Sequence, residues 1–137
     1  MSATYAEPLV GWRLWHVDRH NGLASWSEGA RWPARERLEA RCRRILGRCA
    51  EAPGRGHACG IYALRSRELA ESLLRELPLP VVGTVAIGRV SLWGRVIENV
   101  DGWRAQFAYP YDVVLVGGDA ATARCLRERY AVDVSLA

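Results

Sequence analysis

The chain has 137 residues, of which 50% are apolar and 25% charged, and its formal net charge is +4. This size and composition are those of one globular domain, so we expect residues 1–137 to form a single domain. No apolar run is long enough to cross a bilayer, and the N-terminal residues lack the basic and apolar regions of a secretory signal. We therefore expect a cytoplasmic protein with no membrane partner, whose thiols stay reduced.

The N-terminal part predicts a β-hairpin followed by a helix. Residues 9–17 alternate as a strand does, Asn21-Gly22 is a hairpin turn signal, and residues 23–26 form the returning strand. Residues 34–46 are rich in charge with apolar residues at helical spacing, which predicts a helix that ends at Gly47.

The middle of the chain predicts a second helix and a long hairpin. Ser66 caps a helix whose apolar stripe consists of Leu69, Leu73, Leu74 and Leu77. Residues 81–98 then form the longest strand, in which Gly88 and Gly94 predict bulges. Asp101-Gly102 turns the chain back into an antiparallel strand at residues 103–108.

The C-terminal part reads as strand, helix, strand. After a break at residues 109–111 come a strand at 112–116, a helix at 120–130 capped by Asp119, and a strand at 132–136. This order fits one parallel crossover. The predicted fold is therefore α+β: a twisted, mainly antiparallel sheet with two to three helices and a C-terminal β-α-β unit.

Several short motifs are spread along the chain. They include C-G-I-Y-A at residues 59–63, L-W-G-R-V at 92–96, W-R-A at 103–105 and the opening G-W-R-L-W at 11–15. In these motifs the chain resembles a group of small uncharacterised actinobacterial and phage proteins, over most of its length. The resemblance implies one complete domain and carries over no function.

The richest stretch in chemistry spans residues 42–59, where three cysteines and a histidine follow the spacing C-x6-C-x7-H-x-C. Thiolates and imidazole are the ligands that Zn²⁺ and iron–sulfur centres prefer. His57 and Cys59 point to the same side of an extended segment, as two ligands of one ion must. We therefore predict one metal centre, Zn²⁺ or alternatively a [2Fe–2S] cluster, bound by Cys42, Cys49, His57 and Cys59.

Three questions about this site stay open at the level of sequence. A continuous helix would separate the Cys42 and Cys49 backbones by about 10 Å, so either the helix ends near Gly47 or one cysteine is not a ligand. Cys125, otherwise a helix core residue, is the reserve ligand if His57 is not one. The competing interpretation is that the cysteines are simply buried apolar residues. Nearby guanidinium groups would offset the negative charge of three thiolates on Zn²⁺; they belong to Arg41, Arg43, Arg44, Arg48 and Arg55.

The six tryptophans predict either a heavy core or an aromatic-lined pocket. Trp15, Trp26 and Trp32 lie near arginines in the sequence and are candidates for stacking on a planar ligand. Trp93 and Trp103 lie on paired strands and are candidate cross-strand neighbours.

Three functions compete. The favoured one is a small cytosolic metal-binding domain with a binding or regulatory role, not an enzyme, whose partner is a protein or a small molecule rather than nucleic acid. The first alternative is a nucleic-acid-binding accessory protein, which a net charge of +4 is too small to favour. The second alternative is an enzyme with a pocket on the glycine-bent sheet, whose catalytic residues the sequence does not identify.

Overall fold

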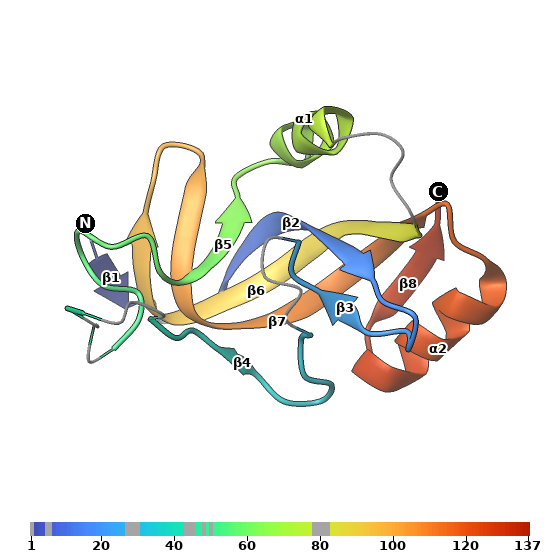
Figure 1. Ribbon diagram of the computed structural model, residues 1–137, viewed down its shortest axis with the longest axis horizontal. Helices are drawn as coiled ribbons and strands as arrows, with labels where there is room; N and C mark the ends of the chain where they lie inside the picture. Colours follow the sequence, from blue (N-terminus) through green and yellow to red (C-terminus); the bar gives the residue numbers. More distant parts are fainter. Residues whose placement is uncertain are drawn as a thin grey trace.

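The computed structural model describes residues 2–4, 7–26, 31–42, 46–47, 49, 51–77 and 83–137 (Figure 1). Within these ranges the chain forms two helices and eight strands, and all the strands belong to one mainly antiparallel sheet. Neither of these helices is long and apolar enough to cross a membrane.

A long hairpin of β6 (Thr84–Glu98) and β7 (Gly102–Val116) is the backbone of the sheet; it crosses Figure 1 in yellow and orange. The predicted turn at Asp101-Gly102 is confirmed, since the Asn99 amide donates to the Gly102 carbonyl at 2.7 Å. The pairing shifts register between Arg89 and Val90 and again between Trp93 and Val96. These irregularities lie beside the two glycines that predicted bulges, and they bend the hairpin.

The other strands line the two outer edges of this hairpin. Along the outer edge of β6 run β2 (Leu9–Val17) and β1 (Ser2–Thr4), and β2 turns at Asn21 into β3 (Leu23–Ala24). Along the outer edge of β7 lie, in order, β5 (Ile61–Leu64), β4 (Leu38–Glu39) and β8 (Asp133–Leu136). β2 also meets β5 where Trp12 pairs with Leu64, so β6, β2, β5 and β7 close into a ring.

Both helices begin as the sequence predicts. α1 (Arg67–Glu76) is capped by Ser66, and α2 (Ala120–Tyr130) by Asp119, whose carboxylate accepts the Thr122 amide at 2.8 Å. α2 connects β7 to the parallel strand β8, which confirms the C-terminal β-α-β unit. The predicted apolar stripe of α1 is wrong in part, because Leu73 is exposed while Ala70 is the residue buried against the sheet.

The predicted helix at residues 34–46 is wrong. In its described part the chain bends at Arg35, which has a left-handed φ of +62°, and then forms β4, whose Leu38 pairs with Ala108. A right-handed helix excludes that φ, and the pairing partner lies far along the sequence. Residues 43–45 of the expected helix lie outside the described residues.

Two further predictions are corrected in β7. The expected break at residues 109–111 is absent, because Pro110 sits opposite Val90 at a register shift, where a missing amide donor is tolerated. Trp93 pairs with Phe107 and Trp103 pairs with Glu98, so the two tryptophans are not cross-strand neighbours.

Two tryptophans form the centre of the core. Trp15 and Trp32 meet edge to face with their ring centroids 5.5 Å apart, and they are 0% and 1% exposed. The Tyr130 hydroxyl ties this centre to α2, since it donates to the Trp32 carbonyl at 2.9 Å and accepts the Leu23 amide at 2.9 Å. The N-terminal hairpin, the segment after it and the last helix are therefore locked together by one tyrosine.

Candidate metal centre

The candidate site lies where one strand of the sheet is interrupted. β4 and β5 are both antiparallel to β7 and lie end to end along it, with Glu39 opposite Phe107 and Ile61 opposite Ala105. Between them, the Ala40 amide donates to the Gln106 carbonyl at 2.8 Å. The chain thus leaves the sheet after Ala40 and rejoins the same line at Ile61. The described residues between 41 and 60 belong to a loop whose two ends are neighbours.

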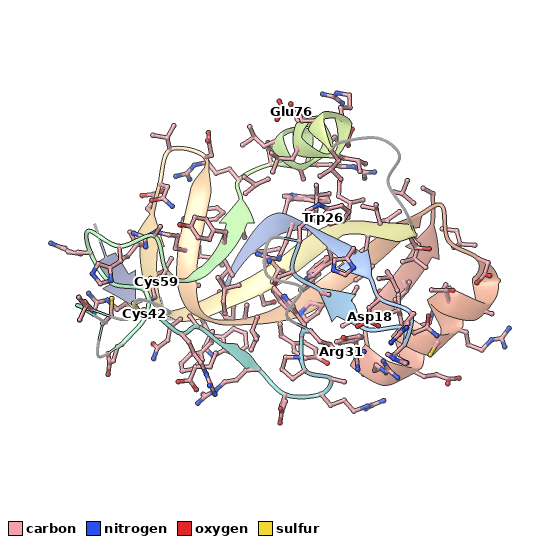
Figure 2. All side chains as sticks on the ribbon, viewed as in Figure 1. Asp18, Trp26, Arg31, Cys42, Cys59 and Glu76 are labelled. Atoms are coloured by element: carbon pink, nitrogen blue, oxygen red, sulfur yellow. The ribbon has the colours of Figure 1, made fainter. Side chains whose placement is uncertain are left out.

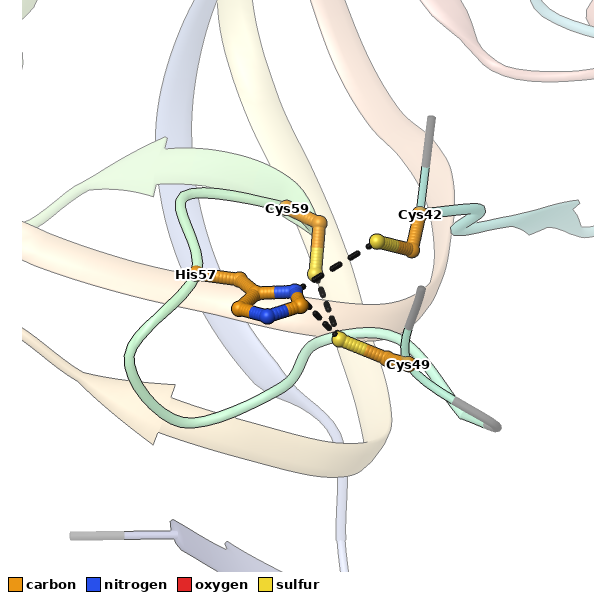
Figure 3. A group of neighbouring side chains, drawn as sticks. All are labelled: Cys42, Cys49, His57 and Cys59. Atoms are coloured by element: carbon orange, nitrogen blue, oxygen red, sulfur yellow. Dashed lines mark hydrogen bonds between the residues drawn. The ribbon is translucent and has the colours of Figure 1, made fainter. Parts of the chain in front are cut away.

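The four predicted ligands lie within this loop, two of them at its neck. Cys42 follows Ala40 by two residues and Cys59 precedes Ile61 by two, so the geometry of the sheet itself brings them close. Figure 2 shows both at the same end of the molecule. Cys49 and His57 come from the body of the loop and complete the group (Figure 3).

The ligand atoms of these residues all lie within 4.8 Å of one another. The Cys49 and Cys59 Sγ atoms are 3.7 Å apart, and the Cys42 Sγ lies 3.5 Å from the His57 Nδ1. In a tetrahedral Zn²⁺ site, two thiolates lie about 3.8 Å apart and a thiolate and an imidazole nitrogen about 3.6 Å apart. Two of the edges therefore already match those of a zinc tetrahedron.

A third edge is shorter. The Cys49 Sγ lies 2.7 Å from the His57 Nδ1, at hydrogen-bonding distance. Binding an ion would require these two atoms to separate by about 1 Å, which a turn of either side chain supplies. The ring is already oriented for this, because it is Nδ1 that faces the three sulfur atoms (Figure 3).

The Cys49 thiol is protonated when no cation is present. Partial burial, followed by the hydrogen bonds with Cys59 and Cys42 and by repulsion between the thiolates, raises the pKa of the Cys49 thiol to about 11. A divalent ion reverses this balance, because it displaces the proton of a coordinated thiol, and this proton is released to solvent. A bound cation would therefore stabilise the thiolate form of this cluster.

The loop is packed tightly around the sulfur atoms. The Gly54 amide donates to the Cys59 Sγ at 3.2 Å, and a Cβ at Gly54 would lie 2.1 Å from the Cys49 Sγ. Only glycine leaves room for that sulfur atom. Amide donors of this kind stabilise coordinated thiolates.

Arg104, on β7, holds the loop from below. Its Nη1 donates to the carbonyls of His57 at 2.6 Å and Cys59 at 2.7 Å, with a longer contact to Gly54 at 3.5 Å. It is 8% exposed and is the buried charged residue of the described part of the chain. Three thiolates and an imidazole on Zn²⁺ carry a net negative charge, which a buried guanidinium beside the site offsets.

The sequence did not indicate Arg104. It predicted that arginines adjacent to the ligands in the sequence would offset the negative charge of the site. Of those, Arg41 and Arg55 are exposed, whereas Arg43, Arg44 and Arg48 lie outside the described residues. The signal for Arg104 was its place in the W-R-A motif on the strand after the second hairpin, but its partners lie about 45 residues away.

The remaining candidates lie elsewhere. Cys125 is half-buried on α2, at the opposite end of the sheet from the cluster (Figures 1 and 2), so it is not a reserve ligand. Trp15 and Trp32 are core residues, which corrects the expectation that they stack on a ligand at the surface. Trp26 is 38% exposed and packs edge to face on His16, with ring centroids 5.5 Å apart.

Comparisons with known proteins give no evidence about this site. No protein family, no curated protein and no solved structure matches the chain. The resemblance drawn from the motifs therefore stays a prediction, and the function must be argued from the described residues.

Proposed function

We propose that this chain is a small domain with one structural Zn²⁺, bound by Cys42, Cys49, His57 and Cys59, and with a binding or regulatory role. One observation carries the proposal: four ligand atoms of the types that zinc prefers lie within 4.8 Å of one another, although they come from residues spread over the whole loop. Structural zinc sites are closed and have four protein ligands, and four candidate ligands lie together here.

The spacing of the ligand atoms favours one ion over a [2Fe–2S] cluster. A cluster distributes its four ligands over two irons, so ligands on different irons lie well apart across the cluster. A set whose members are all within 4.8 Å of one another suits a single tetrahedral ion better. The absorption spectrum separates the two cofactors, because a zinc protein is colourless and an iron–sulfur protein is brown.

A structural role is favoured over a catalytic one. A catalytic zinc usually keeps one position for water and has a general base beside it, whereas here four protein ligands fill the tetrahedron. The glycine-bent sheet does carry an open pocket of about 890 Å³ beside Trp93 and Gly94. Its carboxylates, Glu7 and Glu36, are both exposed, so nothing there favours the enzyme alternative.

The test is metal analysis of untagged protein purified without chelator. The proposal predicts close to one zinc per chain and none in Cys59→Ala, whereas Cys125→Ala keeps its metal. Cobalt substitution provides a second readout, because tetrahedral Co²⁺ bound to thiolates is strongly coloured. Wild-type protein that binds neither metal would overturn the proposal.

A further inference from the structure

A groove of about 1150 Å³ runs from the metal centre towards β3. One part of the lining consists of residues 31–33 and 36–42, from the segment that leads from the core tryptophan Trp32 to Cys42. Another part consists of residues 56–62, which include the start of β5, and the lining also includes Arg13 and Ser25. Arg31 and Cys42, which are labelled in Figure 2, both line it.

The groove exists because β2 and β5 are only partly paired in the ring formed by β6, β2, β5 and β7. β5 pairs with β7 along its whole length, but in the described residues it pairs with β2 only where Leu64 meets Trp12. Towards the metal centre the two strands diverge, and the open edge of β5 borders the groove. A strand edge without a neighbouring strand is a template for adding another strand.

Tyr62 shows which way this edge points. Its carbonyl accepts a hydrogen bond of 2.7 Å from the Arg13 guanidinium, which reaches across the groove from β2. The N–H and C=O of one strand residue point to the same edge, so the Tyr62 amide also faces the groove. Arg13 thus makes one of the hydrogen bonds that a neighbouring strand would make, and the carbonyl keeps a second lone pair for another donor.

Charge indicates what kind of segment fits. The groove is lined by four arginines and two glutamates: Arg13, Arg31, Arg37, Arg41, Glu36 and Glu39. Asp18 pairs with Arg31 at 2.8 Å and reduces the excess to one positive charge, while the pair of Arg37 with Glu39, 4.0 Å apart, is exposed and weak. The remaining positive charge favours an acidic partner. Trp32 offers no stacking face to a base, because it is buried and the Arg13 guanidinium covers its ring at 4.9 Å from the centroid. Tyr62 is the exposed aromatic residue of the lining, and one ring is a small stacking surface for a nucleic acid.

We propose that the groove binds an extended acidic peptide segment of a partner protein, which adds as a strand along the open edge of β5. Main-chain hydrogen bonds to Tyr62 provide the affinity, and carboxylates directed at Arg37 and Arg41 provide the selectivity. The metal centre fixes the end of the groove, since Cys42, His57 and Cys59 line it, but the argument does not depend on which ion is bound.

The test uses zinc-loaded full-length chain and a labelled peptide of about ten residues in which glutamate and valine alternate, followed by fluorescence anisotropy. A lysine–valine peptide and an oligothymidylate of equal length are the comparison probes. The variant pair is Arg37→Glu with Arg41→Glu; the matched control is Arg75→Glu with Arg124→Glu, exposed positions on α1 and α2 that give the same change in net charge. Zinc content is measured for each protein, which reports the metal centre separately from the groove.

The proposal predicts saturable binding of the acidic peptide, weakened roughly tenfold or more by the groove variants but little by the control. The Tyr62 amide should exchange its hydrogen more slowly when the peptide is bound. The proposal is overturned if the acidic peptide does not bind saturably, if both variant pairs weaken it equally, or if the oligothymidylate binds more tightly with the same dependence on Arg37 and Arg41.

Discussion

Removing one ligand at the neck of the loop should cost the domain a defined amount of stability. In Cys59→Ala the proposed metal can no longer join the two chain ends at Cys42 and Cys59. A cross-link that closes a loop of about 18 residues stabilises the folded state by about 3 kcal/mol at 25 °C, in the chain-entropy treatment. We therefore expect Cys59→Ala to lose at least this much unfolding free energy, and its midpoint of thermal unfolding to fall by about 10 °C.

The assay is thermal and urea unfolding of wild type and variant, each with and without a strong chelator. The chelator should lower the stability of the wild type to that of Cys59→Ala and should leave the variant unchanged, because binding free energy is folding free energy here. Cys125→Ala is the matched control; it should cost about 1 kcal/mol or less and keep its sensitivity to chelator. If Cys59→Ala unfolds like wild type in the absence of chelator, the loop is not held by a metal.

Three further predictions concern residues around the loop and the sheet. In Gly54→Ala the new Cβ meets the Cys49 Sγ, so zinc binding should be lost or strongly weakened. The control is Gly56→Ala, where the space is open and φ is +74°; it should cost about 1 kcal/mol of backbone strain and keep the zinc. Equal zinc affinity in the two variants would refute the packing argument. Arg104→Lys keeps the charge, but its ammonium ends one bond short of the Nη1 that donates to the three carbonyls. Zinc affinity measured by chelator competition should therefore fall by about tenfold or more, while Arg124→Lys on α2 should leave it unchanged. Burial acts to raise the pKa of Asp112, but its hydrogen bonds with Arg89 outweigh burial and lower that pKa. The pair therefore stabilises the fold above the usual pKa range of aspartate, and this contribution is lost as the pH falls through the lowered pKa. The difference in unfolding free energy between wild type and Asp112→Asn should be largest near neutral pH and shrink in acid; a difference that does not change with pH would contradict this.

The parts of the fold that depend on neighbouring residues could be predicted from the sequence. The turns at Asn21 and Asp101 need residues that tolerate tight turn geometry, and the caps at Ser66 and Asp119 need a side-chain acceptor next to the first free amides. Each of these signals is complete within a few residues. The order strand, helix, strand at the C-terminus likewise permits few topologies.

The parts that failed depend on partners far along the chain. The apolar residues of the segment 34–46 have helical spacing, but Leu38 pairs with Ala108 of β7 and the chain bends at Arg35. The described residues that lead to Cys42 form a bend and a strand, not the first part of a helix, and the Cys42 and Cys49 side chains lie in one cluster. The interrupted strand brings the neck of the loop together. Tertiary pairing overrode local propensity here and built the site in doing so.

The burial of the tryptophans also required the fold. Trp15 and Trp32 are 17 positions apart, and nothing in their local sequence says that their rings meet. The same holds for Arg104, whose role appears only when its strand lies beneath the loop. The four candidate ligands, by contrast, were grouped from residue type and spacing alone, because metal coordination limits the choice of side chains, and their ligand atoms do lie together.

The most direct test of the metal centre counts thiols and metal in the same sample. Protein purified without chelator is measured by native mass spectrometry and by its reaction with a thiol reagent, before and after chelator treatment. One bound zinc should accompany one rapidly reacting thiol, that of Cys125, and the chelator should remove the zinc and expose all four cysteines of the chain. Four reactive thiols at the outset, with a mass equal to that of the bare chain, would contradict the account.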